Sequence, residues 1–170
     1  MWTVLLSCAL ALGPQDAPVD DKTADQALDT FKTAYKAQAE ADRAEAVTKL
    51  AEAVHVKTLN RLTAILTSSE GPKVRMAAAK GLGQFGAVKK QALTALTGSF
   101  PVCAKDPAIQ AGILQALAAL GDPSSLALVH RSFEEKEPVV VKAALAAAAE
   151  QDGGGRGSGR SGGVTHGGAR

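Results

Sequence analysis

The sequence predicts an all-α fold in which antiparallel helix pairs stack side by side. Hydrophobic residues make up 46% of the chain but aromatic residues only 4%, a composition that suits close packing of alanine-rich helices. A short helix with one apolar face recurs along the chain. Its opening prolines, Pro72, Pro107 and Pro138, lie 35 and 31 residues apart, an interval typical of helical-pair repeats.

The stretch from Gly71 to Gly86 carries this repeat most completely. Pro72 fits the first helical position, where its missing N–H costs nothing. Gly86 stands where a left-handed cap would end the helix. The apolar spacing predicts one buried face, made of Val74, Ala77, Ala78, Leu82 and Phe85. Because such a short helix is marginal alone, neighbouring helices must cover this face.

Further copies flank this one. The next has Asp106 as cap, Pro107 first and Gly121 last, with a stripe of Ile109, Ile113, Ala116, Leu117 and Leu120. The last runs from Pro138 to Glu150, with a stripe of Val141, Ala144, Leu145 and Ala148. Upstream, a helix opened by Asp42 with Glu45 matches the Gly71 copy at a constant offset of 32 and buries Val47, Leu50, Ala51 and Val54.

Second helices complete the pairs. The repeat offset places a turn near His55, followed by a helix with Leu59, Leu62, Thr63 and Leu66 on one face. Later second helices span Ala87 to Thr97 and Ser124 to Phe133. Before the first pair, Thr23 and Gln26 form a capping box that opens a helix whose apolar face is Ala24, Ala27, Leu28, Phe31 and Tyr35.

These units resemble HEAT repeats of the short bacterial type over about residues 42 to 150. One unit matches at Pro72, Val74, Arg75, Ala77 to Ala79, Leu82, Gly83, Phe85 and Gly86, and the next at Asp106, Pro107, Ala116, Leu117, Leu120, Gly121, Asp122 and Pro123. The resemblance implies a right-handed α-solenoid and a binding scaffold. Gln110 and Lys142 stand where the family often has Arg. Whether a ladder of Arg and Asp side chains connects adjacent units is therefore left open.

The chain divides into four parts. Residues 1–13 form a signal or leader segment, 14–22 a linker, 23–150 the helical repeat domain and 151–170 a disordered tail rich in Gly and Ser. The apolar run from Val4 to Leu12 predicts export. Lipid anchoring at Cys8, and an N-terminus that is buried or begins at the wrong Met, are the alternatives.

Nothing in the sequence indicates an enzyme, a cofactor or a metal site. The glycines from Gly81 to Gly86 follow no predicted strand, so they do not form a phosphate loop. His55, His130 and His166 lie far apart, without ligand spacing. Cys103 is predicted to be a small structural side chain in a loop between units. A bilin-lyase-like activity rests on family kinship alone.

The predicted function is therefore protein binding by a non-catalytic scaffold. In the resembled family the second helices usually line the concave side, and here they carry Lys57, Arg61, Lys89, Lys90 and Arg131. Like charges in a concavity reinforce one field, which favours an acidic protein partner. Nucleic-acid binding is the alternative. The segment from Asp16 to Asp29 is acidic, and it could itself occupy the groove.

The last unit has no second helix. An open array end predicts self-association through Pro138 to Glu150, or fraying of that helix. The alternative is that the sequence belongs to a longer repeat protein.

Overall fold

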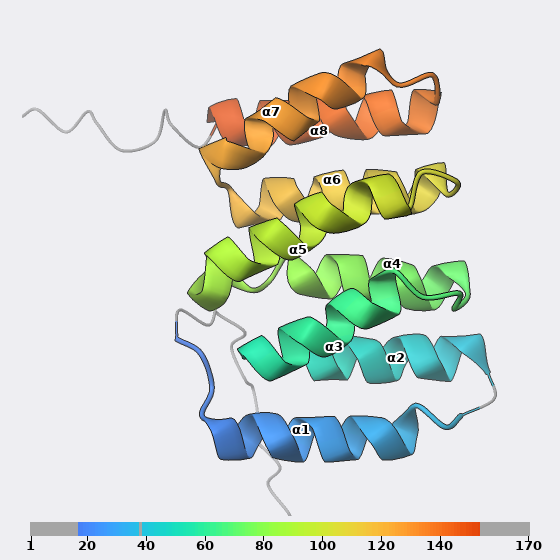
Figure 1. The fold of residues 1–170 in the computed structure, drawn as a ribbon, viewed down its shortest axis with the longest axis vertical. Coiled ribbons are helices and arrows are strands. Elements are labelled where there is room, and N and C mark those ends of the chain that lie inside the picture. The colour runs from blue at the N-terminus through green and yellow to red at the C-terminus, as the bar shows by residue number, and fades with distance from the viewer. Residues whose placement is uncertain (1–16, 38, 154–170) are drawn as a thin grey trace, which may run out of the picture.

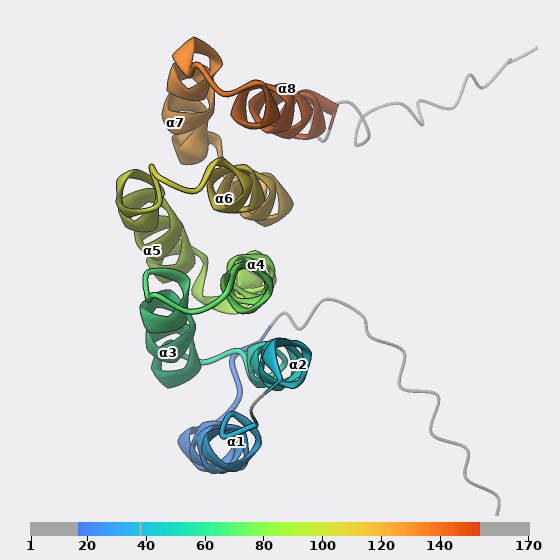
Figure 2. The same ribbon diagram turned by 90° about the vertical axis from the view of Figure 1, so that its right-hand side faces the viewer.

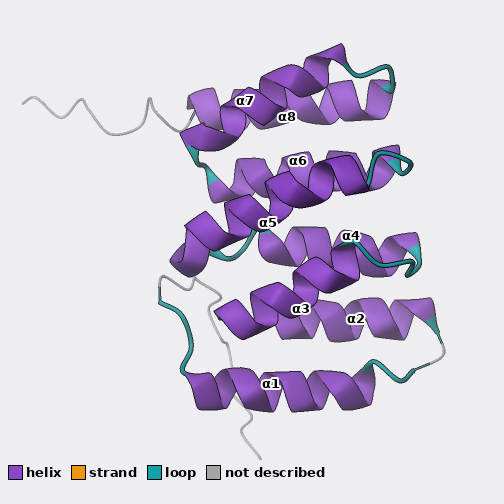
Figure 3. Cartoon of the chain, viewed as in Figure 1, coloured by secondary structure: helices purple, strands orange, loops and turns teal. Residues whose placement is uncertain are grey.

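The computed structural model describes residues 17–37 and 39–153, and the side chains of these ranges up to residue 150. Within them the chain forms helices joined by short loops and turns, without a strand (Figure 3). The α-helices are α1 (Asp21–Ala34), α2 (Glu40–Ala51), α3 (Val56–Leu66), α4 (Pro72–Leu82), α5 (Lys89–Val102), α6 (Pro107–Leu120), α7 (Leu126–Arg131) and α8 (Pro138–Gly153). Short 3-10 turns precede α5 and flank α7.

The helices stack in two layers (Figures 1 and 2). The first layer consists of α2, α4, α6 and α8, and each of these packs along the next. The second layer consists of α3, α5 and α7, while α1 lies at one end of the stack against both α2 and α3. The prediction of an α-solenoid of helix pairs is confirmed, and its handedness stays a prediction.

The predicted stripes form the core. In α4, Val74, Ala78 and Leu82 are fully buried and Ala77 is half-buried, and Phe85, just beyond the end of the helix, is also fully buried. The stripes of α2 and α6 are buried throughout. Gly83 lets α4 and α6 approach closely, because a Cβ there would lie 3.0 Å from the Cα of Ala116. The core therefore combines large apolar side chains such as Leu82 and Phe85 with close helix-on-helix contact at small residues, which the alanine-rich composition predicted.

The predicted cap at Gly86 is wrong. Helix α4 ends at Leu82 with Gly83 in right-handed geometry, and Gly86 opens a 3-10 turn instead. Among the described residues, Gly121 is the glycine with positive φ, at 58°. Gly121 thus provides the predicted left-handed end of α6. The predicted first positions of Pro72, Pro107 and Pro138 are all confirmed.

Two predicted helix starts also need correction. Asp20 caps α1 by accepting the backbone N–H of Thr23 at 2.9 Å, so Asp21 and Lys22 belong to the helix rather than to the predicted linker. Helix α2 begins at Glu40, two residues before the predicted Asp42 start, and Ala39 at its N-cap makes no side-chain bond. In both cases the residue predicted as the N-cap, Thr23 or Asp42, lies inside the first turn of the helix.

The turn near His55 is confirmed, and His55 has a role there that the sequence did not reveal. The Nδ1 atom of His55 accepts the backbone N–H of Lys57 at 3.1 Å, and the backbone N–H of His55 donates to Oγ1 of Thr58 at 3.2 Å. This reciprocal pair satisfies backbone donors at the start of α3, which is the task of a capping box.

The second helices differ in length from their predictions. Helix α5 continues to Val102, beyond its predicted end at Thr97, with Pro101 inside it, and Cys103 caps it in the turn before α6. The Cys103 side chain is fully buried. Helix α7 covers only Leu126–Arg131, with 3-10 turns completing the predicted span. Helix α8 extends beyond Glu150 to Gly153, into the predicted tail.

The predicted stripe of α8 is wrong in part. The helix buries Val140, Ala143, Ala144 and Ala147, whereas Leu145 is 59% exposed and Val141 is half-buried. The buried face is therefore rotated away from Leu145. Predictions for the leader and for residues 154–170 lie outside the described residues.

Arginines join adjacent units at two steps of the stack. Arg75 Nε donates to the carbonyl of Leu66 at 2.9 Å, and Nη1 contacts Oδ2 of Asp106 at 2.7 Å. One unit earlier, Arg43 Nη2 lies 3.3 Å from Oε2 of Glu70. Gln110 occupies the position of Arg75 in the next unit, and it reaches only the carbonyl of Phe100. The ladder of acidic and basic side chains therefore exists, and it stops at Gln110.

Candidate interaction surfaces

The five basic residues predicted to bind a partner all come from the second layer. Lys57 and Arg61 lie on α3, Lys89 and Lys90 on α5, and Arg131 at the end of α7. Neighbouring elements engage three of them separately, namely Lys57, Arg61 and Lys89.

Helix α1 engages both basic residues of α3. The Lys57 Nζ lies 2.9 Å from Oδ1 of Asp21 and 2.8 Å from Oδ1 of Asp25. The guanidinium of Arg61 lies 5.4 Å from the ring centroid of Phe31 and 5.9 Å from that of Tyr35, within the range of a cation–π contact. Asp21 and Asp25 of the acidic segment thus contact this end of the second layer, and occupation of a groove by that segment stays a prediction.

The contacts of Lys57, Asp21 and Tyr35 shift the pKa values of these side chains. Hydrogen bonding to Asp25 and Asp21 raises the pKa of Lys57, and hydrogen bonding to Lys57 lowers the pKa of Asp21. Burial, assisted by Glu70, raises the pKa of Tyr35 to about 12. At neutral pH the Lys57 contacts are therefore an ion pair, and Tyr35 is an uncharged surface for Arg61. Both carboxylates are largely exposed, so the ion pair stabilises the fold only modestly.

Lys89 is held at the junction of α6 and α7. Its Nζ donates to the carbonyl of Gly121 at 3.2 Å and lies 3.8 Å from Oδ2 of Asp122. A hydrogen bond from Ser124 lowers the pKa of Asp122, and the charges of Lys89 and Lys90 act in the same direction. The Lys89 ammonium group is therefore partly occupied by contacts within the chain.

Lys90 and Arg131 are the members of the set that make neither an ion pair nor a cation–π contact with a described residue. Lys90 borders a shallow hollow of about 490 Å³ between α3 and α5, which is also lined by Leu59, Asn60, Thr63, Gln91, Thr94 and Ala95. Arg131 is exposed in the last turn of α7. These two side chains are accordingly the ones most available to a partner on this layer.

The described part of the chain contains no cluster of three or more His, Cys, Asp or Glu side chains that could hold a metal ion. None of the helices described here combines the length and the apolar character needed to cross a membrane.

This geometry defines a class of protein, the α-solenoids built from stacked helix pairs. Residues 28–102, which extend from the second half of α1 to the end of α5, match the family model of HEAT repeats, and this part of the chain is therefore built of HEAT repeats. No curated protein matches the chain. HEAT repeats commonly mediate protein interactions, and the family is typically a non-enzymatic scaffold.

Proposed function

We propose that this protein is a non-catalytic scaffold that binds an acidic protein partner through Lys57, Arg61, Lys89, Lys90 and Arg131 on its second layer. The observation that carries the proposal is the position of Lys90, exposed beside a hollow between α3 and α5 and without an intrachain ion pair among the described residues. Asp21 and Asp25 of α1 already contact Lys57 in the way that a partner's carboxylates would.

Charge reversal tests this proposal. Lys90→Glu combined with Arg131→Glu is expected to weaken binding of a protein that co-purifies with the wild type by about tenfold, and to reduce the salt dependence of that binding. These two positions suit the test better than Arg61, because reversal of Arg61 would also disturb its contacts with Phe31 and Tyr35.

The matched control reverses two lysines outside the second layer, Lys22 on α1 and Lys49 on α2, and should leave binding unchanged. Equal effects of the two double variants would mean that net charge, and not this surface, governs binding. Tight binding of a DNA or RNA oligonucleotide that is lost in Lys90→Glu/Arg131→Glu would instead favour the nucleic-acid alternative.

Export is part of the proposal and is supported by the apolar run in residues 4–12. Fractionation of cells that express the full chain with a C-terminal tag should place it outside the cytoplasm. A cytoplasmic, uncleaved protein would contradict export and would leave the binding surface untouched.

We also propose self-association through the outer face of α8. Ala79, Leu114 and Leu145 each lie seven residues after the first proline of α4, α6 and α8. The first two are fully buried, and Leu145 is 59% exposed. Ala79 faces α6, since a Cβ on Gly112 would lie 3.8 Å from its Cβ. Leu145 therefore occupies the position that, in α4 and α6, is covered by neighbouring helices.

Leu145→Glu is accordingly expected to convert an associated species into a monomer, as measured by light scattering over a concentration series. The matched control is Val102→Glu, which places the same charge on an equally exposed apolar position, 62% exposed at the end of α5. A wild-type protein that stays monomeric at high concentration, with strong amide exchange protection at Leu145, would contradict this part of the proposal.

A further inference from the structure

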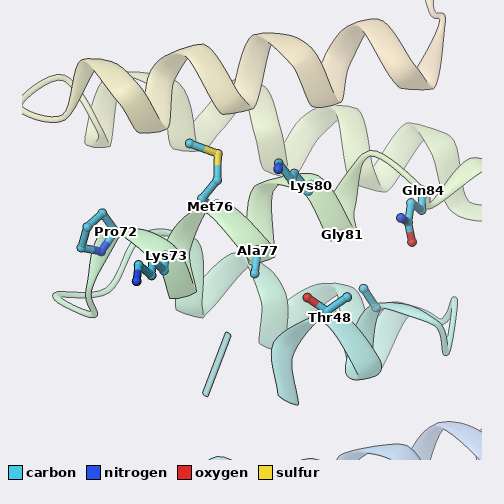
Figure 4. Close-up of a pocket in the computed structure, with 9 residues that line it drawn as sticks. Thr48, Pro72, Lys73, Met76, Ala77, Lys80, Gly81 and Gln84 are labelled. Carbon is cyan, nitrogen blue, oxygen red and sulfur yellow. The ribbon is translucent and has the colours of Figure 1, made fainter. Parts of the chain in front are cut away.

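A second surface lies on the opposite layer, between α2 and α4, and it includes none of the five basic residues of the second layer. It is a groove of about 530 Å³ lined by Thr48, Ala51, Pro72, Lys73, Met76, Ala77, Lys80, Gly81 and Gln84. Figure 4 shows Thr48 on α2 on one side, and Lys73, Ala77 and Lys80 on α4 on the other. The sequence alone does not predict this groove, because it forms only where the two helices lie side by side.

Close contact of the two helices forms the floor of the groove. A Cβ on Gly81 would lie 2.6 Å from the Cβ of Ala51, so α2 and α4 almost touch at this point. The short side chains of Ala51 and Ala77 leave space above them. From Pro72 to Gly81 the groove follows α4 for about 14 Å, which is between two and three helical turns, and Gln84 borders it just beyond the helix end.

The walls supply positive charge. Lys73 and Lys80 are exposed and form no ion pair with a described residue, and none of the residues that line the groove is acidic. Lys73 and Lys80 are seven residues apart, so their side-chain stems lie on one side of α4, about 10 Å from each other. The Glu40 carboxylate, at the start of the groove, accepts the backbone N–H of Lys73 at 2.9 Å.

The repeat itself does not require these lysines. The equivalent positions, counted from the first proline of each helix, hold Ala108 and Gln115 in α6 and Val139 and Ala146 in α8. Those helices pack in the same layer without them. The cationic pair is therefore a local property of the α2–α4 groove and not part of the packing pattern.

We propose that this groove binds an acidic amphipathic helix of a partner protein. Carboxylates two helical turns apart would face Lys73 and Lys80, and apolar side chains between them would lie over Ala77. Met76 lies on the edge toward α6, where its Sδ would clash with a Cβ on Gly112, and its flexible side chain can adapt to the apolar face of the helix. This is the helix-in-groove mode of recognition, with charge setting its register.

The test uses the full chain and a synthetic probe. The probe is a fluorescein-labelled, acetylated and amidated alanine-based helix with Glu at positions 4 and 11 and Leu at positions 7 and 8. Binding is measured by fluorescence anisotropy, and the surface is located by amide chemical-shift changes. We expect saturable binding that shifts the amides of Met76, Ala77 and Gly81, and that weakens about tenfold in Lys73→Glu/Lys80→Glu.

Two controls separate this groove from the second layer. Lys90→Glu/Arg131→Glu should bind the probe as the wild type does, and a probe with Lys in place of both Glu residues should not bind. Equal binding by Lys73→Glu/Lys80→Glu, or shifts confined to α3 and α5, would overturn the inference. Loss of binding to a DNA oligonucleotide in Lys73→Glu/Lys80→Glu, with no binding of the peptide to the wild type, would assign the groove to nucleic acid instead.

Discussion

Leu117→Ala is expected to lower the free energy of unfolding by roughly 2–5 kcal/mol, and Leu82→Ala should do the same. Both side chains are fully buried, in α6 and α4 respectively. Each variant removes apolar atoms and leaves a cavity between helices whose backbones are already in close contact, so the surroundings cannot readily collapse. Urea unfolding monitored by circular dichroism gives the measurement.

Leu145→Ala is the matched control for this prediction. The same chemical change at a side chain that is 59% exposed in α8 should cost well under 1 kcal/mol in the monomer, because little apolar contact is lost. A loss below about 1 kcal/mol at Leu117, or a loss at Leu145 as large as that at Leu117, would mean that the buried faces of these helices are misassigned.

The contrast between α6 and α8 shows how far the sequence could predict the fold. In α6, Ile109, Ile113 and Leu117 mark one face with large side chains, and the structure buries that face. In α8 the alanines between positions 143 and 149 surround the helix, so apolar periodicity cannot select a face. Packing against α6 and α7 selects it, and the prediction therefore placed Leu145 wrongly.

Helix starts were missed for a different reason. Asp20 and Thr23 are both good capping residues, and local sequence does not decide between them. A tertiary contact favours the earlier start, because the backbone N–H of Val19 donates to the carbonyl of Val54 at 3.0 Å. The chain before α1 is thereby held against the end of α2, and Asp20 is left in position to cap.

The candidate binding residues were predicted as a set because they recur on equivalent helices. What the sequence could not reveal is which of them the fold itself uses. Lys57 meets Asp25, 32 residues earlier, and Lys89 meets Asp122, in the next unit. These spacings are close to the length of one repeat, so contacts between successive units are the signal that could have identified them.

Arg75→Ala is expected to lower the free energy of unfolding by about 1.5–3 kcal/mol, the range for hydrogen bonds that involve a charged group. The Arg75 side chain is only 11% exposed. It contacts the carbonyl that ends α3, Sγ of Cys103 at the end of α5, and Asp106 at the start of α6. Its loss would leave the carbonyl of Leu66 without this donor and would uncouple three helix ends.

Arg75→Gln tests the mechanism, because it copies the residue that the next unit has at Gln110. Glutamine can retain a bond to the carbonyl, as Gln110 does with Phe100, but it cannot pair with Asp106. We therefore expect a loss smaller than that of Arg75→Ala, measured by urea unfolding. Lys32→Ala, which removes an exposed pair with Asp29, should have no measurable effect. If Arg75→Gln were as stable as the wild type, the contact with Asp106 would contribute nothing, and helix packing alone would hold adjacent units together.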